Sequence, residues 1–244
     1  MTGTELPKLG LGTVAFGRDW GLKYRRPVSV PSDRELDHLL GVAAELGVTL
    51  LDTAPAYGTS EERLGRLLQG RPHRNRPERF WISTKVGETS TPEGASFDFR
   101  PRAIRESVER SLRRLKVERL DLVFLHAGAD DREAFGGVET LRSLQDEGKI
   151  RWIGASTKTV DGALAARNLC DALMLTYNLH DRSQEAVLDQ ARDTIVLIKK
   201  PLASGHASSP AEALRFAAAH PAVDCVIVGT TSADHLRANA RALA

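Results

Sequence analysis

Four side chains that can move a proton stand at or just beyond the ends of short apolar runs in the sequence. Asp52 follows the run 48–51, Tyr57 lies on the loop after it, and Lys85 and His126 close two later runs. A carboxylate, a phenol, an amine and an imidazole held together can transfer a proton to or from a reacting group. Each residue alone has a structural explanation, such as a loop cap for Asp52 or a buried core histidine for His126. Their joint placement indicates a functional site.

The apolar runs that carry these residues belong to a longer series in which predicted strands alternate with predicted helices. Strands are expected at 9–16, 48–51, 80–85, 120–126, 150–156, 172–177, 194–199 and 224–229. Helices are expected near residues 32–46, 59–68, 101–115, 138–147, 160–169, 183–192, 210–219 and from 232 onward. Capping-box patterns at Ser32–Glu35 and Ser209–Glu212, and prolines at positions 101 and 210, mark helix starts.

Eight strand–helix units favour an α/β fold of the (β/α)8 TIM barrel type, with residues 1–244 as a single domain. An open, doubly wound sheet is the competing architecture. The first unit has no Gly-rich strand-to-helix fingerprint of the dinucleotide-binding type, which weakens that alternative. In a barrel the carboxyl ends of all strands meet on one face. We therefore expect Asp52, Tyr57, Lys85 and His126 at neighbouring positions of that face.

The composition excludes several classes of function. A chain of 244 residues with a formal charge of +2 is too nearly neutral to indicate nucleic-acid binding, and the arginine run 71–79 has no interleaved aromatic residues for base stacking. Cys170 and Cys225 lie in apolar segments far apart and are expected to be buried free thiols. No leader pattern or membrane-length apolar run is visible. We expect a cytoplasmic protein with a small-molecule substrate, no metal site, and no nucleic-acid or membrane partner. The oligomeric state stays open.

Five segments follow one another at the ends of the predicted strands. They are Asp52-Thr-Ala-x-x-Tyr57-Gly58, Ser83-Thr84-Lys85, Leu120-Asp-Leu-x-x-Leu-His126, Lys149-Ile-Arg-x-Ile-Gly-Ala-Ser156 and Gly229-Thr-Thr-Ser-x-x-His-Leu-Arg-x-Asn239. In these segments the sequence resembles the aldo-keto reductase family over roughly residues 9–240. The resemblance implies a TIM barrel that uses a nicotinamide cofactor to interconvert carbonyls and alcohols. It implies NADPH as the cofactor, with NADH as the alternative, and a carbonyl compound as the substrate.

The resemblance also implies a catalytic tetrad of Asp52, Tyr57, Lys85 and His126. Tyr57 is the expected general acid and base. A free tyrosine has a pKa of about 10, so a nearby Lys85 cation is expected to lower that pKa toward neutrality. Asp52 is expected to hold Lys85 in place, and His126 to hydrogen-bond and orient the substrate oxygen.

The cofactor residues implied by the resemblance come from six places in the chain. They are Gly12, Thr13 and Asp52 at the nicotinamide, Ser156 and Thr157 at its carboxamide, Lys199 beside its ring, Leu202, Ser204 and Gly205 along the pyrophosphate, Thr230, Thr231, Ser232 and Arg237 at the adenosine phosphate, and Asn239 at the adenine. A helix N-terminus suits a phosphate because it has free N–H groups and a favourable dipole. Several positions depart from the family pattern. Thr157 replaces an asparagine, Met174 a glutamine, and Lys199 an aromatic residue that commonly stacks on the nicotinamide.

Two other functions stay open from the sequence. An amine at a barrel mouth, either Lys85 or Lys199, is a candidate nucleophile for a Schiff-base aldolase. The substituted nicotinamide subsite is consistent with a non-catalytic regulator that binds the cofactor or a partner. The retained tetrad favours the oxidoreductase over both.

Overall fold

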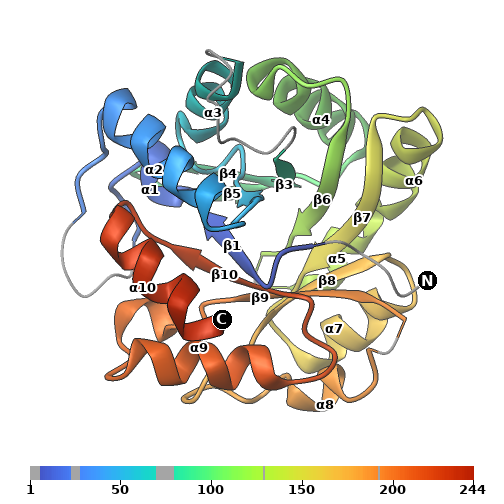
Figure 1. Ribbon diagram of the computed structural model, residues 1–244. Helices are drawn as coiled ribbons and strands as arrows, with labels where there is room; N and C mark the ends of the chain where they lie inside the picture. Colours follow the sequence, from blue (N-terminus) through green and yellow to red (C-terminus); the bar gives the residue numbers. More distant parts are fainter. Residues whose placement is uncertain (1–5, 23–27, 70–79, 129, 192) are drawn as a thin grey trace.

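Eight parallel strands close into a barrel, as predicted from the sequence (Figure 1). The computed structural model describes residues 6–22, 28–69, 80–128, 130–191 and 193–244, and the arginine run 71–79 lies outside these residues. The barrel strands are β1 (Leu9–Gly12), β2 (Leu50–Asp52), β3 (Trp81–Val86), β6 (Leu120–His126), β7 (Ile150–Ser156), β8 (Ala172–Thr176), β9 (Ile195–Lys199) and β10 (Cys225–Gly229). Strand β1 pairs with both β2 and β10, which closes the barrel and confirms the TIM-barrel prediction.

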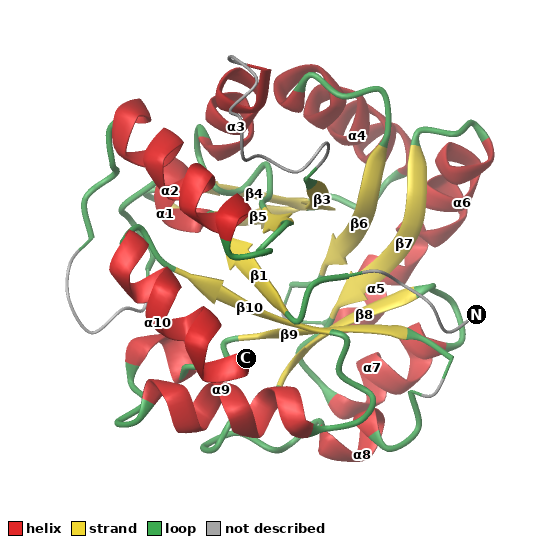
Figure 2. Cartoon of the chain, viewed as in Figure 1, coloured by secondary structure: helices red, strands yellow, loops and turns green. Residues whose placement is uncertain are grey.

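The helices form an outer layer around the barrel (Figure 2). They are α1 (Val14–Gly17), α2 (Asp33–Glu45), α3 (Ser60–Gln69), α4 (Pro101–Leu115), α5 (Asp131–Ala134), α6 (Val138–Asp146), α7 (Val160–Arg167), α8 (Glu185–Leu188), α9 (Pro210–Ala219) and α10 (Ala233–Leu243), with 3-10 turns η1 (Phe135–Gly137) and η2 (Ala203–Gly205). No described helix has the length and apolar character needed to cross a membrane.

Local sequence signals explain most of the helix boundaries. The predicted capping box at the start of α2 is present, because Ser32 accepts from the backbone N–H of Glu35 and the Glu35 carboxylate accepts from that of Ser32. Prolines occupy the first turn of both α4 and α9. The capping box predicted at Ser209 is wrong, since its side chain makes no capping hydrogen bond. Pro210 alone marks that helix start.

Two predicted elements are much shorter in the structure, and one structural feature was not predicted. The strand expected over 9–16 ends at Gly12, because Thr13 turns back to the backbone of Asp52 and a helical turn follows. The helix expected over 183–192 is reduced to the single turn of α8. The segment after β3 contains a hairpin that was not predicted, formed by β4 (Glu88–Thr91) and β5 (Gly94–Phe97).

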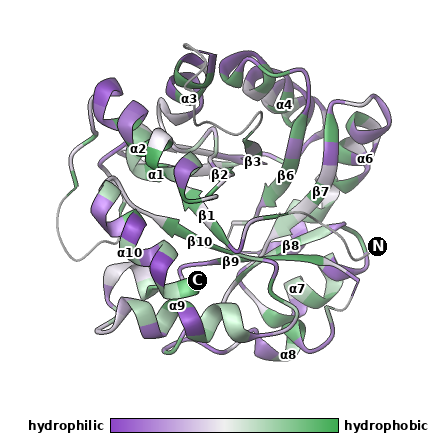
Figure 3. Ribbon diagram, viewed as in Figure 1, coloured by the Kyte–Doolittle hydropathy of each residue, from purple (hydrophilic) through white to green (hydrophobic). Residues whose placement is uncertain are grey.

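Apolar side chains fill the space inside the barrel and the space between the strands and helices. The inner cluster comprises Leu6, Leu50, Leu122, Phe124, Ala172, Met174, Leu197, Cys225 and Ile227. Figure 3 shows the apolar strand β6 against more hydrophilic stretches on the outer helix α4. Burying each large aliphatic or aromatic side chain contributes about 1.5–3 kcal/mol. The two layers therefore hold the strand ends in fixed positions, and the candidate site is built on these ends.

Candidate active site

A buried ion pair joins the ends of β2 and β3. The Lys85 Nζ donates to Oδ1 and Oδ2 of Asp52, both at 2.8 Å, and to the carbonyl oxygen of Thr53 at 2.9 Å. The Ser83 hydroxyl donates to Asp52 Oδ1 at 2.9 Å. The exposed fractions of the two charged side chains are only 2% for Lys85 and 6% for Asp52. The pair is therefore held by several hydrogen bonds and is out of contact with most solvent.

Tyr57 lies against this ion pair. The Lys85 Nζ is 4.8 Å from the centre of the Tyr57 ring, and the Arg18 guanidinium is 5.7 Å from it on the loop after α1. The loop that carries Tyr57 packs closely on Gly17, where an added Cβ would lie 2.1 Å from the Tyr57 carbonyl oxygen. Gly58 has φ +60°, in the left-handed region that glycine adopts readily. These two glycines fix how closely the tyrosine approaches the strand ends.

Burial is the largest influence on the pKa of Tyr57 and raises it above its ordinary value. The Lys85 cation opposes this, but it only partly offsets burial, and Asp52 adds to the increase. The expected net lowering of the Tyr57 pKa is therefore wrong for this structure, although the sign of the Lys85 contribution is as expected. Burial alone would lower the pKa of Lys85, but Asp52 and Tyr57 outweigh it and the net shift is upward. Lys85 is accordingly a cation at neutral pH.

His126 ends β6 and contacts a carboxylate that sequence reasoning missed. The Nδ1 atom of His126 lies 2.6 Å from Oε2 of Glu88, the first residue of β4. The contact does not meet the geometry of an in-line hydrogen bond, and it is an ion pair only when the His126 ring is protonated. The two side chains are 21% and 15% exposed. The sequence offered no signal for Glu88, because the hairpin is polar and has no apolar alternation.

The hairpin is held in place at several points. Arg18 Nη1 donates to the Ser90 hydroxyl at 2.5 Å. At the base of the hairpin, the backbone N–H of Asp98 donates to the carbonyl of Gly87 at 2.8 Å. An added Cβ on Gly87 would lie 2.1 Å from the ring of Phe99, and one on Gly128 would lie 3.2 Å from Phe97. Glu88 thus faces His126 from a fixed element.

Lys199 is the last residue of β9, and its side chain hydrogen-bonds to residues at the end of β7. Its Nζ donates to the Ser156 hydroxyl at 2.9 Å and to the Thr157 carbonyl at 2.8 Å. Burial, with the Lys200 and Lys85 cations, lowers the pKa of Lys199 to about 7. Gln184, which sequence reasoning also missed, donates weakly to Thr157 Oγ1 at 3.4 Å. The structure therefore brings Lys199, Ser156 and Thr157 together.

Met174, which stands where the family pattern has a glutamine, packs inside the barrel with the apolar cluster. Gly12 ends β1 in register with Asp52 and Gly229. The Thr13 hydroxyl donates to the carbonyl of Asp52 at 3.0 Å and contacts the Ser60 hydroxyl at 2.8 Å. Thr13 is therefore a fully buried link between β1, β2 and α3.

The loop after β9 is conformationally strained. Three non-glycine residues, Lys200, Ala203 and Ser204, have φ between +48° and +58°, and Gly205 has φ +86°. Each non-glycine residue in this region costs of order 1–3 kcal/mol, and such residues concentrate at ligand-binding loops. Leu202, also predicted to lie along the pyrophosphate, is part of this loop.

The remaining predicted residues lie around the start of α10. Ser232 caps this helix by accepting from the backbone N–H of His235 at 3.3 Å, and the Ser232 N–H donates to Thr230 Oγ1 at 3.1 Å. Arg237, with 39% of its side chain exposed, lies 3.8 Å from Glu45 at the end of α2. Asn239 is buried on the same helix. Thr230, Thr231 and Ser232 therefore directly precede α10, whereas Arg237 and Asn239 lie further along it.

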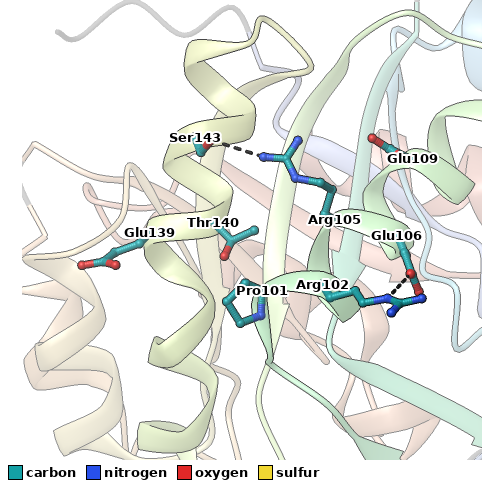
Figure 4. A pocket seen from close by; sticks show the side chains of 8 residues that line it. All are labelled: Pro101, Arg102, Arg105, Glu106, Glu109, Glu139, Thr140 and Ser143. Atoms are coloured by element: carbon teal, nitrogen blue, oxygen red, sulfur yellow. Dashed lines mark hydrogen bonds and ion pairs between the residues drawn. The ribbon is translucent and has the colours of Figure 1, made fainter.

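A groove of about 490 Å³ separates α4 from α6 and contains none of the predicted site residues (Figure 4). Arg105 donates across the groove to the Ser143 hydroxyl at 3.3 Å, and Arg102 pairs with Glu106 within α4. Arg105 also pairs with Glu147, and Glu109 pairs with Lys149, at the outer helical layer. The groove has no part in the chemistry of the strand ends.

Comparisons with known proteins find relatives of this chain. The YhdN aldo-keto reductase of Bacillus subtilis (strain 168) is 32% identical over 199 residues, covering 79% of this chain and 56% of that protein. The NADH-specific methylglyoxal reductase of Escherichia coli (strain K12) is 30% identical over 226 residues, covering 84% of this chain and 66% of that protein. This chain thus spans less than two thirds of either relative.

A solved structure is similar over nearly the whole chain. The crystal structure of PA4992 from Pseudomonas aeruginosa has a TM-score of 0.86 and 40% identity, covering 98% of this chain and 91% of that chain. The model of the aldo/keto reductase family matches residues 8–206, which include the Asp52–Lys85 pair, Tyr57 and His126. This protein therefore belongs to the aldo/keto reductase family, a family of oxidoreductases.

Proposed function

We propose that this protein reduces an aldehyde or ketone to an alcohol, reversibly, with a nicotinamide cofactor. The observation that carries the proposal is the buried Lys85 amine, which lies between the carboxylate of Asp52 and the ring of Tyr57. A cation held there stabilises negative charge on the phenol oxygen at the moment when the proton leaves it.

In the proposed reaction, Tyr57 gives its proton to the substrate oxygen, and the negative charge left on the phenol is balanced by Lys85. Asp52 keeps Lys85 charged and in position. When bound, the cofactor supplies the hydride that reaches the carbonyl carbon. In the reverse direction Tyr57 takes the proton back. Burial raises the pKa of Tyr57, so the phenol is protonated at neutral pH and depends on the Lys85 cation to release its proton.

The chemistry of the predicted cofactor residues fits a dinucleotide. The Ser156 hydroxyl can both donate to and accept from a carboxamide, and it is held by Lys199. The left-handed residues around Ser204 form a backbone turn of the kind that binds phosphate oxygens. The N-terminus of α10, after Thr230, suits a second phosphate. We propose that these three places hold the nicotinamide, the pyrophosphate and the adenosine phosphate.

We propose NADPH as the preferred cofactor, with NADH as the alternative. Arg237 is the basic residue on α10 proposed to bind a 2′-phosphate, and its contact with Glu45 at 3.8 Å is long enough to be exchanged for a phosphate oxygen. The resemblance to the family implies that Gly229 and His235 replace basic residues that often bind this phosphate. One relative, the Escherichia coli methylglyoxal reductase, is described as NADH-specific. The binding experiment therefore compares NADH with NADPH.

One observation favours a second function. Lys199 has a pKa of about 7, so a substantial fraction is the neutral amine that attacks a carbonyl at neutral pH. This supports a Schiff-base aldolase that uses Lys199, whereas the ion pair with Asp52 makes Lys85 a poor nucleophile. A non-catalytic regulator would bind the cofactor without turnover. The intact Asp52–Lys85–Tyr57 arrangement argues against that role.

The test begins with fluorescence titrations of the purified protein with NADPH and NADH. Oxidation of the bound cofactor by a small aldehyde such as methylglyoxal is then followed by absorbance. Binding with turnover supports the reductase, and binding without turnover for a panel of aldehydes and ketones supports the regulator. Borohydride trapping of a carbonyl compound on Lys199, located by peptide mass, with no cofactor binding, would favour the aldolase.

A further inference from the structure

The contact between Glu88 and His126 determines where the imidazole carries its hydrogen. The two facing atoms, Oε2 and Nδ1, are 2.6 Å apart. Two atoms that each present only a lone pair would repel at this distance, so a hydrogen must lie on one of them. It belongs either to a protonated Glu88 or to the Nδ1 of His126.

The surroundings of Glu88 identify it as the charged partner. Burial alone would raise the pKa of the Glu88 carboxyl, but His126 and the Arg18 and Lys158 cations outweigh burial and hold this pKa below its ordinary value. Glu88 is therefore a carboxylate at neutral pH, and the hydrogen lies on Nδ1.

The rest of the site keeps the His126 ring neutral. Burial lowers the pKa of His126 below its ordinary value; Glu88 opposes this shift, and Lys85 and Lys199 reinforce it. A neutral imidazole has one N–H and one lone pair. With Nδ1 buried against Glu88 and 21% of the side chain still exposed, Nε2 is the nitrogen left for a substrate, and it presents the lone pair.

We propose that Glu88 is a positioning residue that holds the hydrogen of neutral His126 on Nδ1. In this state Nε2 accepts a hydrogen bond from a substrate hydroxyl. Nε2 donates a hydrogen bond to a carbonyl oxygen only after the ring is protonated. The inference rests on the proposed reductase function. It assigns one direction of the reaction to each protonation state of the His126 ring. The neutral ring suits an alcohol substrate. The imidazolium suits a carbonyl substrate, because a carbonyl oxygen can only accept.

The first test reads the tautomer directly and needs no activity. Nitrogen-15 NMR of histidine-labelled protein, with the His126 signals assigned from a His126→Asn variant, distinguishes a protonated Nδ1 from a protonated Nε2. Above the pH at which His126 titrates, we expect the hydrogen on Nδ1 in the wild type. In Glu88→Met, which removes the acceptor at similar side-chain size, we expect a shift toward Nε2–H. A wild-type hydrogen on Nε2 overturns the proposal, even if the variant fails to fold.

Glu93→Ala is the matched control, because Glu93 is an exposed carboxylate in the turn of the same hairpin. This variant should keep the wild-type tautomer. A tautomer change in Glu93→Ala equal to that in Glu88→Met would mean that the hairpin as a whole, and not the Glu88 carboxylate, sets the ring state, which would overturn the proposal.

The second test is the pH dependence of kcat/KM for carbonyl reduction. In the wild type it should fall about tenfold per pH unit above the pKa of His126, because the donor ring is lost. In Glu88→Met the fall should disappear, since a neutral ring with hydrogen on Nε2 can donate. A pH-independent wild type, or an unchanged slope in Glu88→Met, contradicts the proposal.

Other groups around His126 have to be separated from it. The pKa of Lys85 and that of Tyr57 are raised, so both titrate at higher pH, whereas Lys199 has a pKa of about 7 and titrates nearby. Lys199→Met should therefore keep the slope. A slope that vanishes in this variant assigns the pH dependence to Lys199 and overturns the proposal. If the wild type has no reductase activity at any pH, the proposed function fails, and the NMR result alone then decides the role of Glu88.

Discussion

Lys85 Nζ is equidistant, at 2.8 Å, from the two carboxylate oxygens of Asp52, and neither side chain is more than 6% exposed. A charge buried to this extent is stable only while its partner is present, because the remaining ion cannot recover its hydration. The pair therefore links the stability of the barrel to the chemistry proposed at its mouth.

Asp52→Asn should destabilise the fold by about 3–5 kcal/mol, because the Lys85 cation is left without its counter-charge. Urea unfolding measures this loss. The double variant Asp52→Leu with Lys85→Met removes both charges and should recover much of the stability without any reductase activity. A single variant as stable as the wild type would show that the pair is not the buried unit described here.

Tyr57→Phe should lower the rate of carbonyl reduction by at least about a hundredfold, because the proton donor is lost. The ring and its contact with Lys85 remain, so the affinity for NADPH should hardly change. Steady-state rates and a fluorescence titration on the same preparation measure the two quantities. Turnover at the wild-type rate would remove Tyr57 from its assigned role.

Gly17→Ala should lower both activity and stability. The added methyl group would lie 2.1 Å from the Tyr57 carbonyl oxygen and 2.2 Å from the Ser60 nitrogen, so the tyrosine loop must move. Such overpacking costs about 1–3 kcal/mol. Gly41→Ala within α2 is the control: an added Cβ meets nothing within 4 Å there, and the change should stabilise the helix by about 0.5–1 kcal/mol. Equal unfolding free energies for the two variants would contradict the close packing.

The fold and the paired charges could be predicted from the sequence, and the hairpin could not. The strands β2 and β6 end at Asp52 and His126, and β3 ends one residue after Lys85. The apolar pattern therefore predicts each strand together with the polar residue near its end. Glu88 contacts His126 only because an exposed polar hairpin folds back over the barrel. No local pattern encodes that approach.

The direction of the Tyr57 pKa shift could not be predicted from the sequence either. The identity of the neighbouring cation, Lys85, follows from strand order, but the net shift depends on how deeply the phenol is buried. Burial is a property of the packed loop on Gly17 and cannot be obtained from residue types alone. The roles proposed for the cofactor residues remain predictions for the same reason.

Arg237→Ala should weaken binding of NADPH and leave binding of NADH unchanged, because only NADPH carries the 2′-phosphate that Arg237 is proposed to bind. Loss of a charge-assisted hydrogen bond of this kind amounts to about 1.5–3 kcal/mol, or roughly a tenfold to hundredfold weaker affinity. Parallel fluorescence titrations measure both affinities. Arg241→Ala, one turn further along α10, is the control. Equal weakening of NADH binding would mean that Arg237 does not read the phosphate.

Lys199→Met should stabilise the protein at neutral pH, with a gain that shrinks as the pH rises. In the folded chain the pKa of Lys199 is about 7, against 10.5 for the free side chain, so between these values the unfolded chain binds more protons. The stability of the wild type must therefore rise with pH across this window, while below about pH 7 the full cost of burying the cation is present. The methionine variant has no such cost.

Urea unfolding of the wild type and of Lys199→Met at about pH 6.5 and about pH 9.5 tests this dependence. The difference in unfolding free energy should be larger at the lower pH. Lys116→Met is the control, because this lysine is exposed and is not among the charges that shift the pKa of Lys199. A difference that is independent of pH would mean that Lys199 keeps its proton in the folded protein. The neutral amine required by the aldolase alternative would then be absent at neutral pH.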